Sequence, residues 1–246
     1  MEALEVVSDG HRLNAGVVVP ENPRGLVVLL HGIPSISPPE PGDTGYPGLA
    51  ERFAAAGWAA LWVDMRAVRG SEGHFSIEGW VRDLQAVLDV RGRHPQIKDL
   101  PTVVVGSSAG GAVAATAVHR GAGVRGLALL AAPASWVSFA GDPADALRRI
   151  TEDAGMTVAP DVIEDPIAWA DEFQGVATIA AIGHIDVPVL IVHGTADSVV
   201  PVQHAHLLAE AAPDAELRII EGAEHQLRKE PAAVDAVLEW MEKVLA

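Results

Sequence analysis

An α/β fold is predicted by the alternation of strand-sized apolar runs with helical patterns along the 246 residues of the chain. Residues 26–31, LVVLLH, form a continuous apolar run, which is typical of a parallel strand covered on both faces. The runs at residues 4–8 and 13–20 flank a Ser-Asp-Gly-His turn and predict an antiparallel hairpin at one edge. The sequence therefore predicts a mostly parallel eight-stranded sheet with helices on both faces.

The other five strands are predicted from β-branched or aliphatic runs that end at Gly, Pro or polar residues. They are residues 58–64, 102–105, 124–132, 187–193 and 215–221. Helices are expected where apolar residues recur at helical spacing between polar ones, and where alanines follow one another. They are residues 49–56, 77–88, 202–211 and 231–245, together with an Ala-rich segment that runs to residue 119.

Residues 134–184 break the alternation of strands and helices. They carry Trp136, Phe139, Trp169 and Phe173, a large share of the few aromatic side chains in the chain. We interpret this segment as a small cap inserted into a single domain of residues 1–246, with the four aromatics lining a substrate pocket. The alternative is a longer crossover whose aromatics are buried in the main core.

The composition excludes several classes of function. The chain has 33 acidic and 17 basic residues, a formal charge of −16, which argues against binding to nucleic acid or to anionic membrane surfaces. Without cysteine it has neither disulfides nor a thiolate nucleophile. The start, MEALEVVSDGHRL, lacks the basic and apolar regions of a signal peptide, so a cytoplasmic protein is expected if no signal has been removed.

The segment GSSAGG at residues 106–111 is the strongest motif in the sequence. Only Ser108 has glycine both two residues before and two residues after it, and it stands between a predicted strand and a predicted helix. This context favours a nucleophile elbow, a strained turn that presents a serine at a helix N-terminus. The alternative is a capping serine in an ordinary Gly/Ser-rich loop, and the strand and helix on either side favour the elbow over it.

A serine hydroxyl needs a base, and the base needs a group that orients it. His225 directly follows the last predicted strand, at the edge where functional loops of parallel sheets gather. Asp197 lies just past the strand at residues 187–193, and its alternative role is to cap the helix that follows. His31 and His193 also end strands, but each precedes a glycine, so we expect their rings to bond nearby backbone.

The order Ser108, Asp197, His225, with His31-Gly32 after an early strand, resembles the α/β-hydrolase superfamily over nearly the whole chain. The small size and short cap are similar to carboxylesterase, feruloyl esterase and monoacylglycerol-lipase-like members. The resemblance implies an α/β-hydrolase fold and an oxyanion hole formed by two backbone N–H groups. One would belong to Ile33, after His31-Gly32, and the other to Ala109, after the nucleophile.

Three stretches depart from common family patterns. The first oxyanion loop reads HGIP rather than HGGG, the elbow reads GSSAGG, and the segment after Asp64 reads MRAVRGSEG, a lengthened form of the usual D-x-R-G-x-G-x-S. These departures leave the subfamily and the substrate open, while the residues that the chemistry needs are present.

The expected function is hydrolysis of small-molecule carboxylic esters through an acyl-enzyme on Ser108, without a cofactor or metal, by a monomer or homodimer. Thioesterase, acyltransferase, perhydrolase and aminopeptidase activities stay open, because each can use the same three residues. A second class is a ligand-binding or signalling relative with slow or no turnover. Ester turnover that depends on Ser108 distinguishes the two classes.

Overall fold

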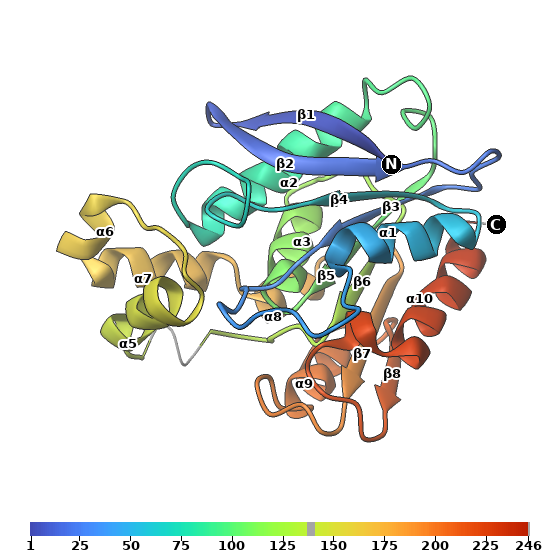
Figure 1. The fold of residues 1–246 in the computed structure, drawn as a ribbon. Helices are drawn as coiled ribbons and strands as arrows, with labels where there is room; N and C mark the ends of the chain where they lie inside the picture. The colour runs from blue at the N-terminus through green and yellow to red at the C-terminus, as the bar shows by residue number, and fades with distance from the viewer. Residues whose placement is uncertain (137–140, 246) are drawn as a thin grey trace.

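The computed structural model describes residues 1–136 and 141–245, and its centre is an eight-stranded sheet (Figure 1). The strand order is β1-β2-β4-β3-β5-β6-β7-β8. The strands are β1 (Glu2–Ser8), β2 (His11–Val18), β3 (Leu26–Leu30), β4 (Ala59–Val63), β5 (Thr102–Ser107), β6 (Gly126–Leu130), β7 (Val189–Gly194) and β8 (Glu216–Ile220). The pairs β1–β2 and β2–β4 are antiparallel and the other pairs are parallel, which confirms the predicted sheet.

Five helices cover the two faces of the sheet. They are α1 (Gly45–Ala55), α2 (Ile77–Arg91), α3 (Ala109–His119), α9 (Gln203–Ala211) and α10 (Pro231–Val244). Helices α1 and α10 bury their apolar residues in one core cluster, and α2, α3 and α9 bury theirs in another. Every residue of β3, β4, β6 and β7 is buried between them, as the continuous apolar runs predict.

In its described part, the segment between β6 and β7 carries short helices and no strand. They are α5 (Pro143–Arg148), η1 (Arg149–Asp153), α6 (Pro160–Glu164), α7 (Pro166–Gly175) and α8 (Thr178–Ile182). Helices α5, α6 and α7 lie together at one side of the molecule, while α8 packs on α3 (Figure 1). The Phe75 amide donates to the Thr157 carbonyl at 2.7 Å, and the Ser76 hydroxyl donates to Glu172 at 2.7 Å. These bonds attach the segment to the loop that precedes α2.

In the part of the chain that the structure describes, no helix is both long enough and apolar enough to cross a membrane.

Candidate active site

Ser108 is the single residue between β5 and α3, and its backbone conformation is strained. Its φ is 51° and its ψ is −123°, a region that residues with side chains rarely adopt. The Ser108 amide donates to the Leu130 carbonyl of β6 at 2.8 Å, and the Ser108 carbonyl accepts from the Gly111 amide at 2.8 Å. The predicted strand, turn and helix are therefore present, and neighbouring backbone holds the strained residue in place.

The glycines around Ser108 are required by close backbone contacts. A Cβ on Gly106 would lie 2.4 Å from the Gly110 carbonyl oxygen, and a Cβ on Gly110 would lie 2.4 Å from the His31 carbonyl oxygen. A Cβ on Gly32 would lie 2.7 Å from the Ser108 Cβ. The turn after β3 is thus packed directly against the turn that carries Ser108.

The two proposed oxyanion donors, the Ile33 and Ala109 amides, directly follow these two turns. Ala109 is the first residue of α3, where backbone N–H groups have no partner within the helix. Ile33 directly follows Gly32, which touches Ser108. Within residues 1–136 and 141–245, neither the Ile33 amide nor the Ala109 amide donates a hydrogen bond. In that part of the chain both N–H groups lack another acceptor, and their role as oxyanion donors beside the serine stays a prediction.

His31 fixes the turn that carries the Ile33 amide. Its Nε2 accepts from the Met65 amide at 2.9 Å, so the ring proton lies on Nδ1, which donates to the Gly32 carbonyl at 2.7 Å. Burial lowers the pKa of His31 below its usual value, in keeping with a neutral ring. The expectation that this ring bonds nearby backbone is confirmed.

His225 and Asp197 form a hydrogen-bonded pair at the carboxyl edge of the sheet. The distance between His225 Nδ1 and Asp197 Oδ2 is 2.8 Å, the carboxylate is fully buried, and the imidazole is 21% exposed. The loops after β7 and β8 are joined by two backbone bonds of 3.0 Å, from the Thr195 amide to Ile220 and from the Ala196 amide to Ala223. This is the arrangement of a base with the acid that orients it.

Asp197 uses its two oxygens for different partners. Oδ1 accepts from the Val199 and Val200 amides at 2.9 and 2.8 Å. Oδ2 accepts from His225 and lies 3.3 Å from Nε2 of His193. The predicted alternative, a cap for the segment at residues 199–203, is met by the two Oδ1 contacts with the turn that begins this segment, although α9 itself begins only at Gln203.

Hydrogen bonding keeps the Asp197 carboxylate charged. Burial alone would raise its pKa, but the hydrogen bonds from His193, His225 and the Val200 amide outweigh burial and hold the pKa well below its usual value. A carboxylate that stays ionised at neutral pH can accept a hydrogen bond from the Nδ1–H group of His225 and stabilise a positive imidazolium.

Ser108 and His225 lie in loops at the same edge of the sheet, after β5 and β8. The hydrogen bonds of the described residues do not include one between the Ser108 hydroxyl and the His225 ring. Contacts between nucleophile and base are often loose without substrate. The structure thus shows the pair of base and acid, while the contact between nucleophile and base stays a prediction.

The cap aromatics form a buried cluster. The ring centroids of Trp136 and Trp169 each lie 5.2 Å from that of Phe173, and Phe75 lies 6.2 Å from both Trp169 and Phe173. This cluster is continuous with the main core, as the alternative interpretation predicts. A pocket lined by these three residues stays a prediction, and Phe139 lies outside the described residues.

Sequence reasoning missed an ion pair that fixes the loop of His225. Arg228, three residues after His225, binds both oxygens of Asp43 at 2.6 and 2.5 Å. The hydrogen bond from Arg228 holds the pKa of Asp43 well below its usual range. The partners are 185 residues apart in the sequence, so no spacing signal could have revealed the pair.

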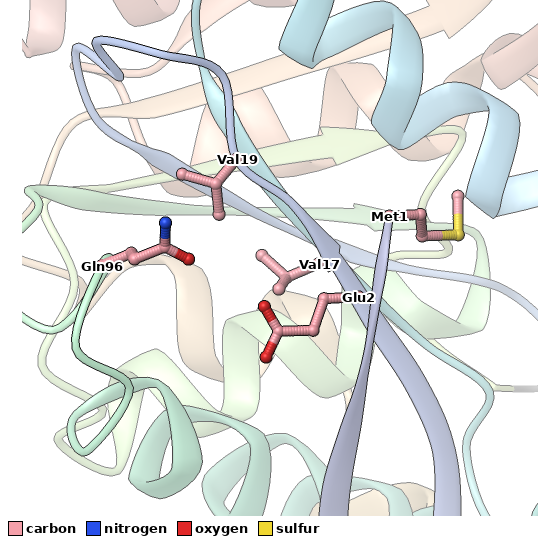
Figure 2. A pocket seen from close by; sticks show the side chains of 5 residues that line it. All are labelled: Met1, Glu2, Val17, Val19 and Gln96. Carbon is pink, nitrogen blue, oxygen red and sulfur yellow. The ribbon is translucent and has the colours of Figure 1, made fainter.

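Two surface hollows lie away from these residues. One of about 200 Å³ is lined by Met1, Glu2, Val17, Val19 and Gln96 (Figure 2). The other, of about 600 Å³, is lined by nine residues between Arg91 and Arg125, at the amino ends of β5 and β6. Among the described residues, no group of three or more His, Asp or Glu side chains could hold a metal ion.

A family profile described as serine aminopeptidase S33 matches residues 21–162 and 169–232. The chain belongs to this family. It has the α/β-hydrolase fold, as the sequence resemblance implied.

Curated and solved relatives agree with this membership. A monoacylglycerol lipase of Mycolicibacterium smegmatis is 26% identical over 271 residues, covering 94% of this chain and 93% of the lipase. An uncharacterized peptidase of Bacillus subtilis, YtmA, is 27% identical over 218 residues, covering 83% of this chain and 76% of the peptidase. The structure of Est1E from Butyrivibrio proteoclasticus with bound ferulic acid superposes with a TM-score of 0.74 at 22% identity, covering 99% of each chain, and confirms the predicted fold.

Proposed function

We propose that this S33 family member hydrolyses carboxylic esters through an acyl-enzyme on Ser108, with His225 as general base and acid and Asp197 as its orienting acid. The observation that carries the proposal is the 2.8 Å bond between His225 Nδ1 and the buried Asp197 carboxylate, at the sheet edge where the strained Ser108 also lies. Because Asp197 accepts a hydrogen bond from the Nδ1–H group, the free lone pair of the neutral His225 ring is on Nε2. That nitrogen is the one able to accept a proton from serine.

In the first half of the reaction, Ser108 Oγ attacks the ester carbonyl carbon and its proton passes to His225 Nε2. The carbonyl oxygen becomes an oxyanion, which the Ile33 and Ala109 amides stabilise. Loss of one such donor typically costs about 10²–10³ in turnover. The carbon–oxygen bond to the alcohol then breaks, and His225 gives its proton to the departing oxygen.

In the second half, water takes the place of the alcohol. His225 removes a proton from the water as its oxygen attacks the acyl carbon, and the same two amides hold the second oxyanion. The bond to Ser108 Oγ breaks, the serine recovers its proton from His225, and the carboxylic acid leaves. Ester and water are consumed, and alcohol and acid are formed.

The substrate class follows from the relatives. A monoacylglycerol lipase and an esterase that binds ferulic acid support small to medium esters of a fatty or aromatic acid. The family description and the Bacillus peptidase support a second candidate, cleavage of a peptide bond at a free amino end by the same residues.

The test is a substrate panel with a matched inactive variant. Wild-type protein and Ser108→Ala are assayed with p-nitrophenyl acetate and butyrate, a monoacylglycerol, methyl ferulate and an aminoacyl p-nitroanilide. We expect steady turnover of one or more esters by wild type and none by Ser108→Ala. Turnover unchanged in Ser108→Ala would refute the proposal, and a fluorophosphonate adduct on Ser108 without steady turnover would favour a ligand-binding relative.

A further inference from the structure

His193 contacts the same carboxylate oxygen as His225. Its ring is fully buried at the end of β7, with Nε2 lying 2.8 Å from the Val200 carbonyl oxygen and 3.3 Å from Asp197 Oδ2. Both partner atoms can only accept, because the carboxylate is ionised, so the ring proton is on Nε2. His193 therefore donates toward Val200 and, over the longer distance, toward Asp197.

The other ring nitrogen of His193, Nδ1, takes no part in these contacts. Nδ1 is buried and has no hydrogen-bond partner in the described part of the chain. A second proton there would be a buried donor without an acceptor, which is costly. The His193 side chain therefore supplies one N–H group, which points toward the Asp197 carboxylate and toward the Val200 carbonyl in the turn that follows.

The contacts of Asp197 explain why a second donor on Oδ2 matters. The terminal torsion of an aspartate side chain has a broad distribution of angles, so hydrogen bonds to one oxygen alone allow the carboxylate plane to rotate. The Val199 and Val200 amides hold Oδ1, and His193 lies on the Oδ2 side from within the sheet. Together these contacts engage both oxygens of Asp197 from groups other than His225.

We propose that His193 is a positioning residue, whose Nε2–H holds the Asp197 carboxylate in the orientation that aims Oδ2 at His225. This inference rests on the proposed function, since Asp197 is assigned there as the orienting acid. It differs from a purely structural role, in which the bond to the Val200 carbonyl would stabilise the turn and nothing more.

Variants whose side-chain amides lie at different distances from the backbone distinguish the two roles. In His193→Gln the side-chain amide stands at the position of Nε2, whereas in His193→Asn it stands at the position of Nδ1. His193→Phe keeps a buried ring without any donor. Thr178→Val is the matched control, because Thr178 is fully buried and its hydroxyl donates to the Pro133 carbonyl at 2.6 Å, a bond to backbone with no carboxylate involved.

Two quantities are measured at a temperature where each variant is folded. The first is the NMR resonance of the His225 Nδ1 proton, assigned by its loss in His225→Ala. The second is kcat and KM for the best ester. We expect His193→Phe and His193→Asn to shift or broaden the resonance and to lower kcat by about 10- to 100-fold with KM changed less than about threefold, because small displacements of reacting groups cost up to about 10². His193→Gln should restore the resonance and most of kcat, and Thr178→Val should change neither.

Equal kcat and equal resonances in His193→Gln and His193→Asn would overturn the inference and leave His193 a structural residue. The comparison of Gln with Asn decides the point even if His193→Phe does not fold. Failure of the proposed function would show itself separately, as wild-type protein without Ser108-dependent turnover, while the resonance would still report whether His193 positions the pair.

Discussion

The same dipeptide directly follows β3 and ends β7, and its histidine has a different role at each place. His31-Gly32 and His193-Gly194 each place a buried ring at the end of a parallel strand and a glycine against another part of the candidate site. The His31 ring binds backbone through both nitrogens, and its turn offers the Ile33 amide. The His193 ring reaches a carboxylate and leaves one nitrogen without a partner among the described residues.

The difference teaches that the partner, and not the dipeptide, sets the role of the histidine. The β3 turn presents backbone to the site, so its ring needs only to fix the path of the chain. The β7 turn presents a side chain, Asp197, so its ring lies beside the group that must be oriented. Four variants and a pH series test this difference between the two histidines.

The largest effect is expected at the acid itself. Asp197→Asn should lower kcat by about 10⁴-fold, as amide replacement of the triad acid does in serine proteases, because His225 would adopt the wrong tautomer. The variant should fold, since the Asn carbonyl oxygen can still accept from the Val199 and Val200 amides. Steady-state kinetics and circular dichroism check both points. Near-normal kcat would leave the Asp197 side chain with a structural role alone.

The next effect is expected at Gly32. Its substitution by alanine places a Cβ 2.7 Å from the Ser108 Cβ, so the turn must retreat and the Ile33 amide with it. We expect kcat to fall by about 10²–10³, the usual cost of one oxyanion donor. Inhibition by a boronic acid transition-state analogue should weaken in parallel. A normal kcat would show that the Ile33 amide is not one of the donors.

Gly194, which follows His193 as Gly32 follows His31, is the position that corresponds to Gly32. A Cβ there would lie 2.1 Å from the Ala223 carbonyl oxygen, a backbone atom that cannot swing aside. We expect Gly194→Ala to lower the free energy of unfolding by about 1–3 kcal/mol, typical of overpacking, and to displace the loop of His225. Urea denaturation measures the loss. Unchanged stability would mean that the two loops are not held together by this contact.

A smaller effect on activity is expected at His31. His31→Phe leaves the buried Met65 amide without its acceptor, which costs about 1–3 kcal/mol of stability. Because the ring does not contact the reacting groups, kcat of the folded protein should stay within severalfold of wild type. A fall as large as that of Asp197→Asn would remove the contrast between the two turns.

The smallest effect is the pH dependence of stability. Burial lowers the pKa of His31, so the unfolded chain binds a proton more readily and stability falls as pH drops below about 6.5, the usual value for histidine. The lowered pKa of Asp197 acts in a more acidic window, since its contribution is lost only below about 3.9. Urea denaturation from pH 4 to 8 should show a shallower decline in His31→Phe than in wild type. An identical slope would contradict a neutral buried His31.

The sequence predicts the sheet, the elbow and the pair of His225 and Asp197 because each depends on local patterns. Apolar runs define buried strands, glycines mark the tight turn at Ser108, and the edge of a parallel sheet brings His225 and Asp197 together. The contact of His193 with Asp197 could not be predicted, because four residues of loop can follow many paths. The burial of Trp169 and Phe173 and the pair of Arg228 with Asp43 likewise depend on long-range packing.

The central claim is that Ser108 and His225 act as one unit, and a double-mutant cycle tests it most directly. The values of kcat are measured for Ser108→Ala, His225→Ala and the double variant on the best ester. When two residues act as one unit, removing either one already abolishes the rate enhancement that both provide. The double variant should therefore be no slower than the slower single variant. Losses that multiply in the double variant would show that the two side chains act independently and would contradict the account.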